Sequence, residues 1–249
     1  MRKFGLIGYP LGHSFSKRYF TEKFDNEDIS DCSYDNFPIR SIEQLPDLIN
    51  SVPELEGLNV TIPYKSSVIS YLNHIDREAS EIGAVNVLKL KRRRIKAKVF
   101  GYNSDVNGIR DSLCHVLKHI RQAMVMGTGG SAKTVCYVLE KAGIMVIRVS
   151  RTRKPGVISY NDIKPDLIKV TDLIVNTTPL GMFPDTGSKP DFCYDCLDKR
   201  HIMFDLVYNP EITAFLKEGQ ERGCNVITGL KMLRSQAERS WEIWNSADY

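Results

Sequence analysis

A run of polar side chains at strand spacing contains the first residues that could do chemistry. In residues 57–65, apolar side chains alternate with Asn59 and Thr61, so one face of the predicted strand carries an amide and a hydroxyl. Pro63 ends the strand, and Lys65 follows on the turn. On these residues alone, an edge strand with a solvated polar face is the favoured interpretation.

Further polar groups follow other predicted elements. A buried strand is expected over residues 3–8, and Ser14 and Ser16 come shortly after it. They could bind a small polar ligand at the carboxyl end of the strand, although Ser14 is also typical of a helix N-cap. Asp105 precedes the apolar stripe of a helix predicted through residue 117, where an N-cap is again the alternative.

A glycine-rich turn lies between a predicted strand and a predicted helix. The apolar run 123–126 leads into Gly-Thr-Gly-Gly-Ser-Ala at 127–132, which has the G-x-G-x-x-A form of a dinucleotide fingerprint. A helix is expected over 132–142 and a strand over 144–149. Glycines in this position let backbone N–H groups and the helix N-terminus approach a pyrophosphate.

The end of the second strand indicates which dinucleotide binds. An NAD site typically has a carboxylate there for the ribose hydroxyls. This chain has Ser150-Arg151-Thr152-Arg153-Lys154 instead, and three cations favour the 2′-phosphate of NADP. The alternative is a surface loop with ordinary charges.

Periodicity predicts an α/β protein with a second set of parallel strands after the glycine turn. The loop at 176–182 follows one of these strands, at the position where a nicotinamide would lie. The basic segment 89–98 is expected to form a solvated hairpin tip. The remaining expected strands are 32–37, 83–88, 99–102, 172–177, 201–207 and 225–228, and the remaining expected helices are 15–24, 42–52, 67–75, 78–82, 212–222 and one from 229.

Composition is ordinary for a globular protein, with 42% hydrophobic residues, 26% charged residues and a net charge of +4 over 249 residues. The weak positive charge does not indicate nucleic acid, and no apolar run approaches the ~20 residues of a membrane span. The N-terminus lacks a signal-peptide pattern, so a cytoplasmic location is expected. The six cysteines include Cys193-x-x-Cys196, but no second pair completes a zinc site, so no metal is predicted and the thiols are expected to be reduced.

Together these segments resemble the shikimate dehydrogenase family over essentially the full length of the chain. The segments that carry the resemblance are Gly-His-Ser-Phe-Ser-Lys at 12–17, Asn-Val-Thr-Ile-Pro-Tyr-Lys at 59–65, Gly-Ala-Val-Asn at 83–86, Gly-Tyr-Asn-Ser-Asp at 101–105, Gly-Thr-Gly-Gly at 127–130, Ser-Arg-Thr at 150–152, Asn-Thr-Thr-Pro-Leu-Gly-Met at 176–182, Asp-Leu-Val-Tyr-Asn-Pro at 205–210 and Gly-Leu-Lys-Met-Leu at 229–233. Their number and order make the match specific.

The resemblance implies reversible, NADPH-dependent reduction of 3-dehydroshikimate to shikimate, a step toward chorismate and the aromatic amino acids. It implies a substrate-binding α/β domain with a mainly parallel sheet (1–105), a Rossmann-type NADP-binding domain (106–228), and C-terminal helices (229–249) that pack back on the first domain. The implied partners are the small-molecule substrate and the cofactor, without nucleic acid or membrane. The protein would be a monomer or a homodimer.

The resemblance also implies roles for individual residues. Lys65 and Asp105 would be catalytic, with the lysine as the general acid and the aspartate binding substrate and holding the ammonium. Substrate would be bound by Ser14, Ser16, Asn59, Thr61, Asn86, Tyr208 and Gln236. NADP would be bound by Gly127, Gly129, Gly130, Ser131, Ala132, Ser150, Arg151, Thr152, Thr178, Met182 and Gly229.

The chain departs from the family pattern at few positions. Ser104 and Ser150 replace a usual threonine and a usual asparagine, and the chain ends soon after Trp244. A quinate/shikimate dehydrogenase that uses NAD or both cofactors is the nearest alternative, and Arg151 argues against it. A catalytically inactive NADP-binding regulator would require a damaged Lys65 or Asp105, and both are intact.

Overall fold

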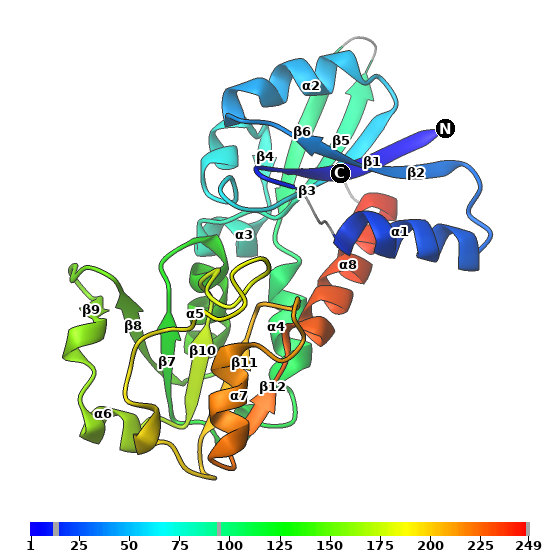
Figure 1. The fold of residues 1–249 in the computed structure, drawn as a ribbon. Coiled ribbons are helices and arrows are strands. Elements are labelled where there is room, and N and C mark those ends of the chain that lie inside the picture. The colour runs from blue at the N-terminus through cyan, green and yellow to red at the C-terminus, as the bar shows by residue number, and fades with distance from the viewer. Residues whose placement is uncertain (12–14, 94–95, 248–249) are drawn as a thin grey trace. The chain divides into compact units, whose positions relative to one another are not determined.

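The computed structural model describes residues 1–11, 15–93 and 96–247 and divides into two compact units. Unit 1 consists of Met1–Ser104 together with Ala237–Tyr249, and unit 2 is Asp105–Gln236. Each unit is of the α/β kind and has a six-stranded sheet (Figure 1). The last change of domain was expected at residue 229, and the two units divide within the final helix, α8 (Gly229–Asn245).

The sheet of unit 1 is mainly parallel, as predicted, with the strand order β2-β1-β3-β5-β6-β4. Among the described strands of this sheet, only β5 runs antiparallel to its neighbours. The carboxyl ends of β1, β3 and β6 therefore lie at one edge, where β5 begins. The strands are β1 (Arg2–Gly8), β2 (Cys32–Pro38), β3 (Leu55–Val60), β4 (His74–Ile75), β5 (Val87–Arg93) and β6 (Lys96–Tyr102).

Apolar side chains on the two faces of this sheet form two separate clusters. Leu6 and Ile7 are adjacent on β1 but belong to different clusters, because successive strand residues point to opposite faces. One cluster includes residues of α2 and α3, and the other includes residues of α1 and the second half of α8. The helical segments of unit 1 are α1 (Phe15–Asn26), the 3₁₀ turn η1 (Ile42–Gln44), α2 (Leu45–Ser51), the 3₁₀ turn η2 (Ser67–Tyr71) and α3 (Arg77–Ile82).

The helix expected over residues 67–75 is wrong. The 3₁₀ turn η2 ends at Tyr71, and His74–Ile75 pairs with β6 as the short edge strand β4. The Asn73 backbone N–H donates to the Val99 carbonyl over 2.9 Å, and the Asn73 side chain accepts from the Val99 N–H over 2.8 Å. This pairing with a distant strand overrides the helical period of the local sequence.

The expectation of a solvated hairpin over 89–98 is wrong at its first residue, and residues 94–95 at its tip lie outside the described residues. Lys89 lies within β5 with only 4% of its surface exposed. Its Nζ donates to the carbonyl of Ile243 and to the hydroxyl of Ser246, both over 2.9 Å. This buried ammonium therefore caps the C-terminal end of α8.

Trp244 anchors the same end of α8 to unit 1. Its indole Nε1 donates to the Leu88 carbonyl over 3.0 Å, and its ring stacks on Phe4 with the centroids 4.8 Å apart. A Cβ at Gly57 would lie 2.3 Å from Nε1, so glycine is needed there for the indole to fit. These contacts pack the C-terminal helix on the first domain, as the sequence predicts.

Unit 2 has a fully parallel sheet among its described strands, with the order β12-β11-β10-β7-β8-β9. The order reverses between β7 and β10, which makes this the switch point of a doubly wound sheet. The strands are β7 (Gln122–Met126), β8 (Met145–Ser150), β9 (Ile158–Ser159), β10 (Leu173–Asn176), β11 (Ile202–Asp205) and β12 (Asn225–Ile227).

Helices connect the strands of unit 2 in the manner of a Rossmann fold. Helix α5 (Gly130–Lys141) joins β7 to β8, and α7 (Ala214–Glu221) joins β11 to β12. Figure 1 shows α7 in front of the sheet and α5 behind it. Unit 2 also contains α4 (Asp105–Leu113), α6 (Pro165–Lys169) and the 3₁₀ turns η3 (Leu117–His119), η4 (Tyr160–Asp162) and η5 (Tyr194–Cys196). No helix among the described residues is long and apolar enough to cross a membrane.

Candidate functional site

Amide and hydroxyl side chains of unit 1 meet at the edge where β3 and β6 end and β5 begins. Asn59 is on β3, Asn86 directly precedes β5, and Ser104 follows β6. The Val60 N–H donates to the Asn86 carbonyl over 2.8 Å, which joins the two asparagine segments. Asn59 and Asn86 are 5% and 2% exposed, so both amides need partners in the protein or in a ligand.

The Asn86 side chain is fixed by Ser104. Its Nδ2 donates to the Ser104 hydroxyl over 3.0 Å, and its Oδ1 accepts from the Ser104 backbone N–H over 2.7 Å. The Ser104 hydroxyl also lies 3.1 Å from the hydroxyl of Ser240 on α8. Serine at position 104, one of the departures from the family pattern, thus keeps a hydroxyl that bonds the Asn86 amide.

The Asn59 amide has partners on both of its polar atoms. Its Nδ2 donates to the Ser240 hydroxyl over 2.9 Å and more weakly to the Asn86 carbonyl over 3.4 Å. Its Oδ1 accepts from the hydroxyl of Tyr34 on β2 over 2.9 Å. The predicted residues Asn59 and Asn86 are therefore members of one buried polar network.

The turn after β3 carries Thr61 and Lys65. The Thr61 N–H donates to the Ile7 carbonyl over 2.9 Å, so the turn begins against the end of β1. A Cβ at Gly8 would lie 2.5 Å from the Thr61 methyl group, and glycine there makes room for this approach. The Lys65 carbonyl accepts from the Val85 N–H over 2.7 Å, which holds the lysine backbone beside the segment that leads to Asn86.

Ser16 lies in the first turn of α1, and its side chain interacts with the phenol of Tyr34. Burial raises the pKa of Tyr34 well above its usual value, so the phenol stays protonated. Ser14, the other predicted serine, lies outside the described residues.

Three predicted substrate residues belong to unit 2. Asp105 opens α4 and is 3% exposed, and Tyr208 is half-buried in the loop after β11. Gln236 lies on α8, and its Nε2 donates to the Leu233 carbonyl over 3.0 Å. Lys65, in contrast, belongs to unit 1.

The glycine turn between β7 and α5 has the local geometry of a phosphate-binding loop. Gly127 has a φ of +119°, and a Cβ there would lie 2.4 Å from the Thr177 hydroxyl. Gly129 is the residue before α5, and a Cβ there would have no atom within 4 Å. The open space at Gly129 and the exposed N–H groups of the first turn fit a pyrophosphate. Gly130, Ser131 and Ala132 form that first turn.

The end of β8 exposes the cations that were predicted to select NADP. Ser150 is the last residue of the strand, and its hydroxyl bonds the Thr152 carbonyl. Arg151 and Thr152 are exposed beyond it. Because β7 and β8 are neighbouring parallel strands, these residues and the glycine turn lie at the same edge of the sheet.

The loop after β10 contains the predicted Thr178 and Met182 and is fixed by Asn176. The Asn176 Oδ1 accepts from the Thr178 N–H over 3.0 Å and from the Thr178 hydroxyl over 2.6 Å. Its Nδ2 donates to the Leu180 carbonyl over 3.1 Å. Met182 is 42% exposed, so its side chain is accessible to a ligand.

Asp205 at the end of β11 holds the neighbouring loops. It accepts hydrogen bonds from Asn176 Nδ2 at 3.0 Å, from the Val207 N–H at 2.9 Å and from the Thr213 hydroxyl at 2.6 Å. Burial raises its pKa to about 6 despite these bonds. Gly229 begins α8 close by, where a Cβ would lie 2.6 Å from the Leu206 carbonyl oxygen.

Sequence reasoning did not single out Tyr34, Ser240 or Asp205 as members of the site. Tyr34 and Ser240 reach Asn59 from positions 25 and 181 residues away, and neither lies in a recognisable motif. Asp205 did carry a usable signal, because it is a carboxylate at the carboxyl end of an apolar strand.

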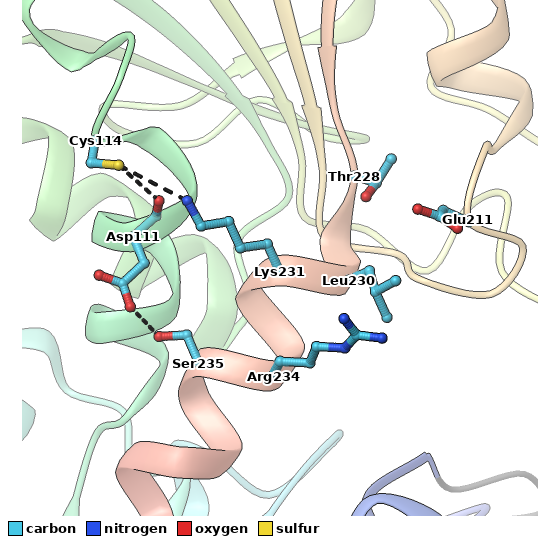
Figure 2. A pocket seen from close by; sticks show the side chains of 8 residues that line it. All are labelled: Asp111, Cys114, Glu211, Thr228, Leu230, Lys231, Arg234 and Ser235. Atoms are coloured by element: carbon cyan, nitrogen blue, oxygen red, sulfur yellow. Dashed lines mark hydrogen bonds between the residues drawn. The ribbon is translucent and has the colours of Figure 1, made fainter.

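A separate hollow in unit 2, of about 520 Å³, contains none of the predicted site residues. Figure 2 shows the Ser235 hydroxyl bonded to the Asp111 carboxylate, and Lys231 Nζ is 4.0 Å from Cys114 Sγ. These pairs join α8 to α4 and to the turn directly after it. Among the described residues there is no group of three or more His, Cys, Asp or Glu residues that could hold a metal ion.

The chain resembles proteins of one family over nearly its whole length. Residues 6–88 match the family model described as shikimate dehydrogenase substrate binding domain. A protein of Methanococcus aeolicus named shikimate dehydrogenase (NADP(+)) is 36% identical over 258 residues, which cover 96% of this chain and 90% of that protein.

Solved structures give the same result for the fold. Shikimate 5-dehydrogenase from Thermus thermophilus, in complex with NADP(H) and shikimate, matches with a TM-score of 0.83 and 28% identity over 98% of this chain and 94% of that one. Quinate dehydrogenase from Corynebacterium glutamicum, in complex with NAD, matches with a TM-score of 0.83 and 25% identity over 98% of this chain and 93% of that one. The architecture is common to both kinds of enzyme, so it does not separate their activities.

Proposed function

Because this chain belongs to the shikimate dehydrogenase family, we propose that it catalyses the NADPH-dependent, reversible reduction of 3-dehydroshikimate to shikimate. The observation that carries the proposal is the 36% identity to a shikimate dehydrogenase (NADP(+)) over nearly the full length. The buried amides and hydroxyls at the sheet edge of unit 1 support it. A ring that carries several hydroxyls needs such short polar groups, and an unpaired one would be costly.

The residues of unit 2 fit an NADP cofactor, which supplies the hydride when it is bound. The first turn of α5 and the open space at Gly129 would accept the pyrophosphate. Arg151 would pair with the 2′-phosphate, and Ser150 and Thr152 would lie beside it. We assign Gly127, Gly130, Ser131 and Ala132 to the same loop, and Thr178, Met182 and Gly229 to the nicotinamide side.

Lys65 and Asp105 would form the catalytic pair, and seven further polar side chains would bind the substrate. Reduction of a ketone builds negative charge on its oxygen, and the Lys65 ammonium would stabilise that charge and donate the proton. Asp105 would complete the catalytic pair. The polar groups that would bind the ring hydroxyls and the carboxylate are those of Ser14, Ser16, Asn59, Thr61, Asn86, Tyr208 and Gln236.

The domain roles follow from these assignments. Residues 1–105 would form the substrate-binding domain and 106–228 the NADP-binding domain, with the C-terminal helix returning to the first. A cytoplasmic location is part of the proposal, and the six free cysteines support it because disulfides are rare in that compartment. A monomer or a homodimer is the proposed assembly.

A quinate/shikimate dehydrogenase with NAD or dual cofactor use is the second candidate, favoured by the fold shared with the NAD-bound quinate dehydrogenase. The exposed Arg151 and the lack of a carboxylate in residues 150–154 favour NADP instead.

The test is an absorbance assay of cofactor reduction, with shikimate or quinate as substrate and NADP or NAD as oxidant. Turnover of shikimate with NADP that greatly exceeds the other three combinations supports the proposal. Comparable turnover of quinate with NAD would favour the second candidate. No turnover in any combination would contradict both.

A further inference from the structure

The orientation of the Asn59 amide is set by two side chains that no sequence motif identifies. Tyr34 donates to its Oδ1 over 2.9 Å, and the Ser240 hydroxyl accepts from its Nδ2 over 2.9 Å. A rotation of the amide by half a turn would place Nδ2 against the Tyr34 proton. The Asn86 carbonyl, which can only accept and lies 3.4 Å from Nδ2, disfavours the flipped amide, and the two hydroxyls hold the amide in the observed orientation.

Burial makes these contacts strong constraints. Tyr34 is 3% exposed, Ser240 is 0% exposed and Asn59 is 5% exposed. Where water is excluded, a polar group that loses its protein partner finds no water molecule to replace it. Breaking either hydrogen bond therefore costs free energy, and the observed orientation of the amide is favoured. The Tyr34 ring is itself fixed by stacking on Phe20, with the centroids 4.5 Å apart.

The donors and acceptors of the Asn59 amide that protein groups already use determine which kind of ligand group Asn59 can still bind. Within the part of the chain that the structure describes, its partners use both Nδ2 hydrogens and one of the two lone pairs of Oδ1. The second lone pair can accept a hydrogen bond. A ligand group that meets Asn59 must therefore donate, as a hydroxyl does, whereas an ionised carboxylate cannot.

We propose that Tyr34 and Ser240 are positioning residues that orient the Asn59 amide so that its Oδ1 accepts a hydrogen bond from a substrate hydroxyl. The inference rests on the proposed function, since it takes shikimate as the ligand. The side chain of Ser16, which is also assigned to the substrate, interacts with the same phenol. Ser240 connects the C-terminal helix to the same site.

The experiment is a double-mutant cycle read by steady-state kinetics with shikimate and NADP. We expect Ser240→Ala and Tyr34→Phe each to raise the KM for shikimate about tenfold, the effect of losing about one well-placed hydrogen bond, with the KM for NADP within about twofold of the unaltered value. In an Asn59→Ala background, Ser240→Ala should change the shikimate KM less than about twofold, because Ser240 acts through Asn59.

Two control variants each remove a buried hydroxyl of unit 2 that donates to a backbone carbonyl. Ser112→Ala loses the bond to Gly108, and Tyr194→Phe loses the bond to Pro190. Both should leave the shikimate KM unchanged, and their shifts in Tm give the scale of a purely structural effect. Ser240→Ala adds a good helix former, so it carries the test alone if Tyr34→Phe fails to fold.

The possible outcomes separate the two proposals. An unchanged shikimate KM in Ser240→Ala, or an effect that multiplies with that of Asn59→Ala, would overturn the positioning role while leaving the proposed function standing. An unaltered protein that does not turn over shikimate would overturn both.

Discussion

The Asn176 amide donates to the Asp205 carboxylate over 3.0 Å at the carboxyl ends of the adjacent strands β10 and β11. Through this bond, the loop from Asn176 to Met182 and the segment from Asp205 to Thr213 share one buried polar centre. Asp205 is completely buried, and its pKa is raised to about 6. Its ionisation therefore links the stability of unit 2 to pH.

The Asp205→Asn variant should lose less stability than the unaltered protein as pH rises from 4 to 7. Below pH 6 the folded protein keeps a proton that the unfolded chain, with an aspartate pKa of about 3.9, has released. Folding therefore binds a proton in this window, and stability from this group falls as pH rises. Between pH 4 and 7, the free energy of unfolding of the variant should rise by about 2 kcal/mol relative to that of the unaltered protein.

Urea unfolding at half-unit pH steps measures this shift as the difference between variant and unaltered protein. Hydrogen bonds altered by the substitution add the same free energy at every pH, so they do not affect how the difference changes with pH. Asp185→Asn, which removes an exposed carboxylate, is the control. A difference between Asp205→Asn and the unaltered protein that stays constant from pH 4 to 7 would show that Asp205 ionises normally.

The Gly129→Ala variant should weaken NADP binding without loss of stability. A Cβ at this position meets no atom within 4 Å, so the protein itself accommodates alanine. The added methyl group would keep the pyrophosphate away from the backbone, and we expect the Kd for NADP to rise at least about tenfold.

Calorimetric titration with NADP and thermal unfolding of the free protein give the two readouts. Gly187→Ala is the matched control, because its Cβ also meets open space. In contrast, Gly127→Ala should lower stability as well, because φ is +119° and Thr177 is 2.4 Å from the new Cβ. Unchanged NADP affinity in Gly129→Ala would mean that the pyrophosphate does not approach this turn.

The Arg151→Ser variant should lose most of its preference for NADP over NAD. A charge-assisted hydrogen bond to the 2′-phosphate corresponds to a preference of about tenfold to a hundredfold, and the exposure of Arg151 favours the lower end. The ratio of kcat/KM for the two cofactors is the quantity to measure. Arg77→Ser removes an exposed arginine of unit 1 and controls for net charge. If the ratio does not change in Arg151→Ser, the interpretation of the β8 end is wrong.

The Lys65→Ala variant should lower kcat at least as much as kcat/KM. Loss of a general acid typically costs about a hundredfold to ten-thousandfold in rate. The steady-state rate at saturating substrate and cofactor gives kcat, and partial rescue by added methylamine would identify the missing group as an ammonium. Lys98→Ala, at an exposed lysine on β6, is the control. A near-normal kcat in Lys65→Ala would exclude lysine as the acid.

The elements with strong local signals were predictable from the sequence. Residues 3–8 and 123–126 are apolar runs, and both form strands within one residue of the expected ends. The glycine turn was recognised because its residues carry the backbone requirements themselves, as the positive φ of Gly127 illustrates. The parallel class of the two sheets followed from the alternation of strands and helices.

Features that depend on distant partners were not predictable. Lys89 looks like one cation in a basic segment, and only the carbonyls of α8, about 154 residues further on, make its burial favourable. Residues 67–75 have a helical period, but the pairing of β4 with β6 decides their structure. In the same way, Asn59 could be identified, whereas Tyr34 and Ser240, which orient it, come from other parts of the chain.

The closure of unit 1 by Trp244 has a consequence for the order of events during synthesis. All six strands of that unit emerge from the ribosome first, but the indole that fills the space at Gly57 is translated only after unit 2. Unit 2 is one continuous segment, so its whole length is translated before unit 1 can be completed. The aromatic core on one face of the first sheet therefore stays incomplete until the second half of α8 has been translated.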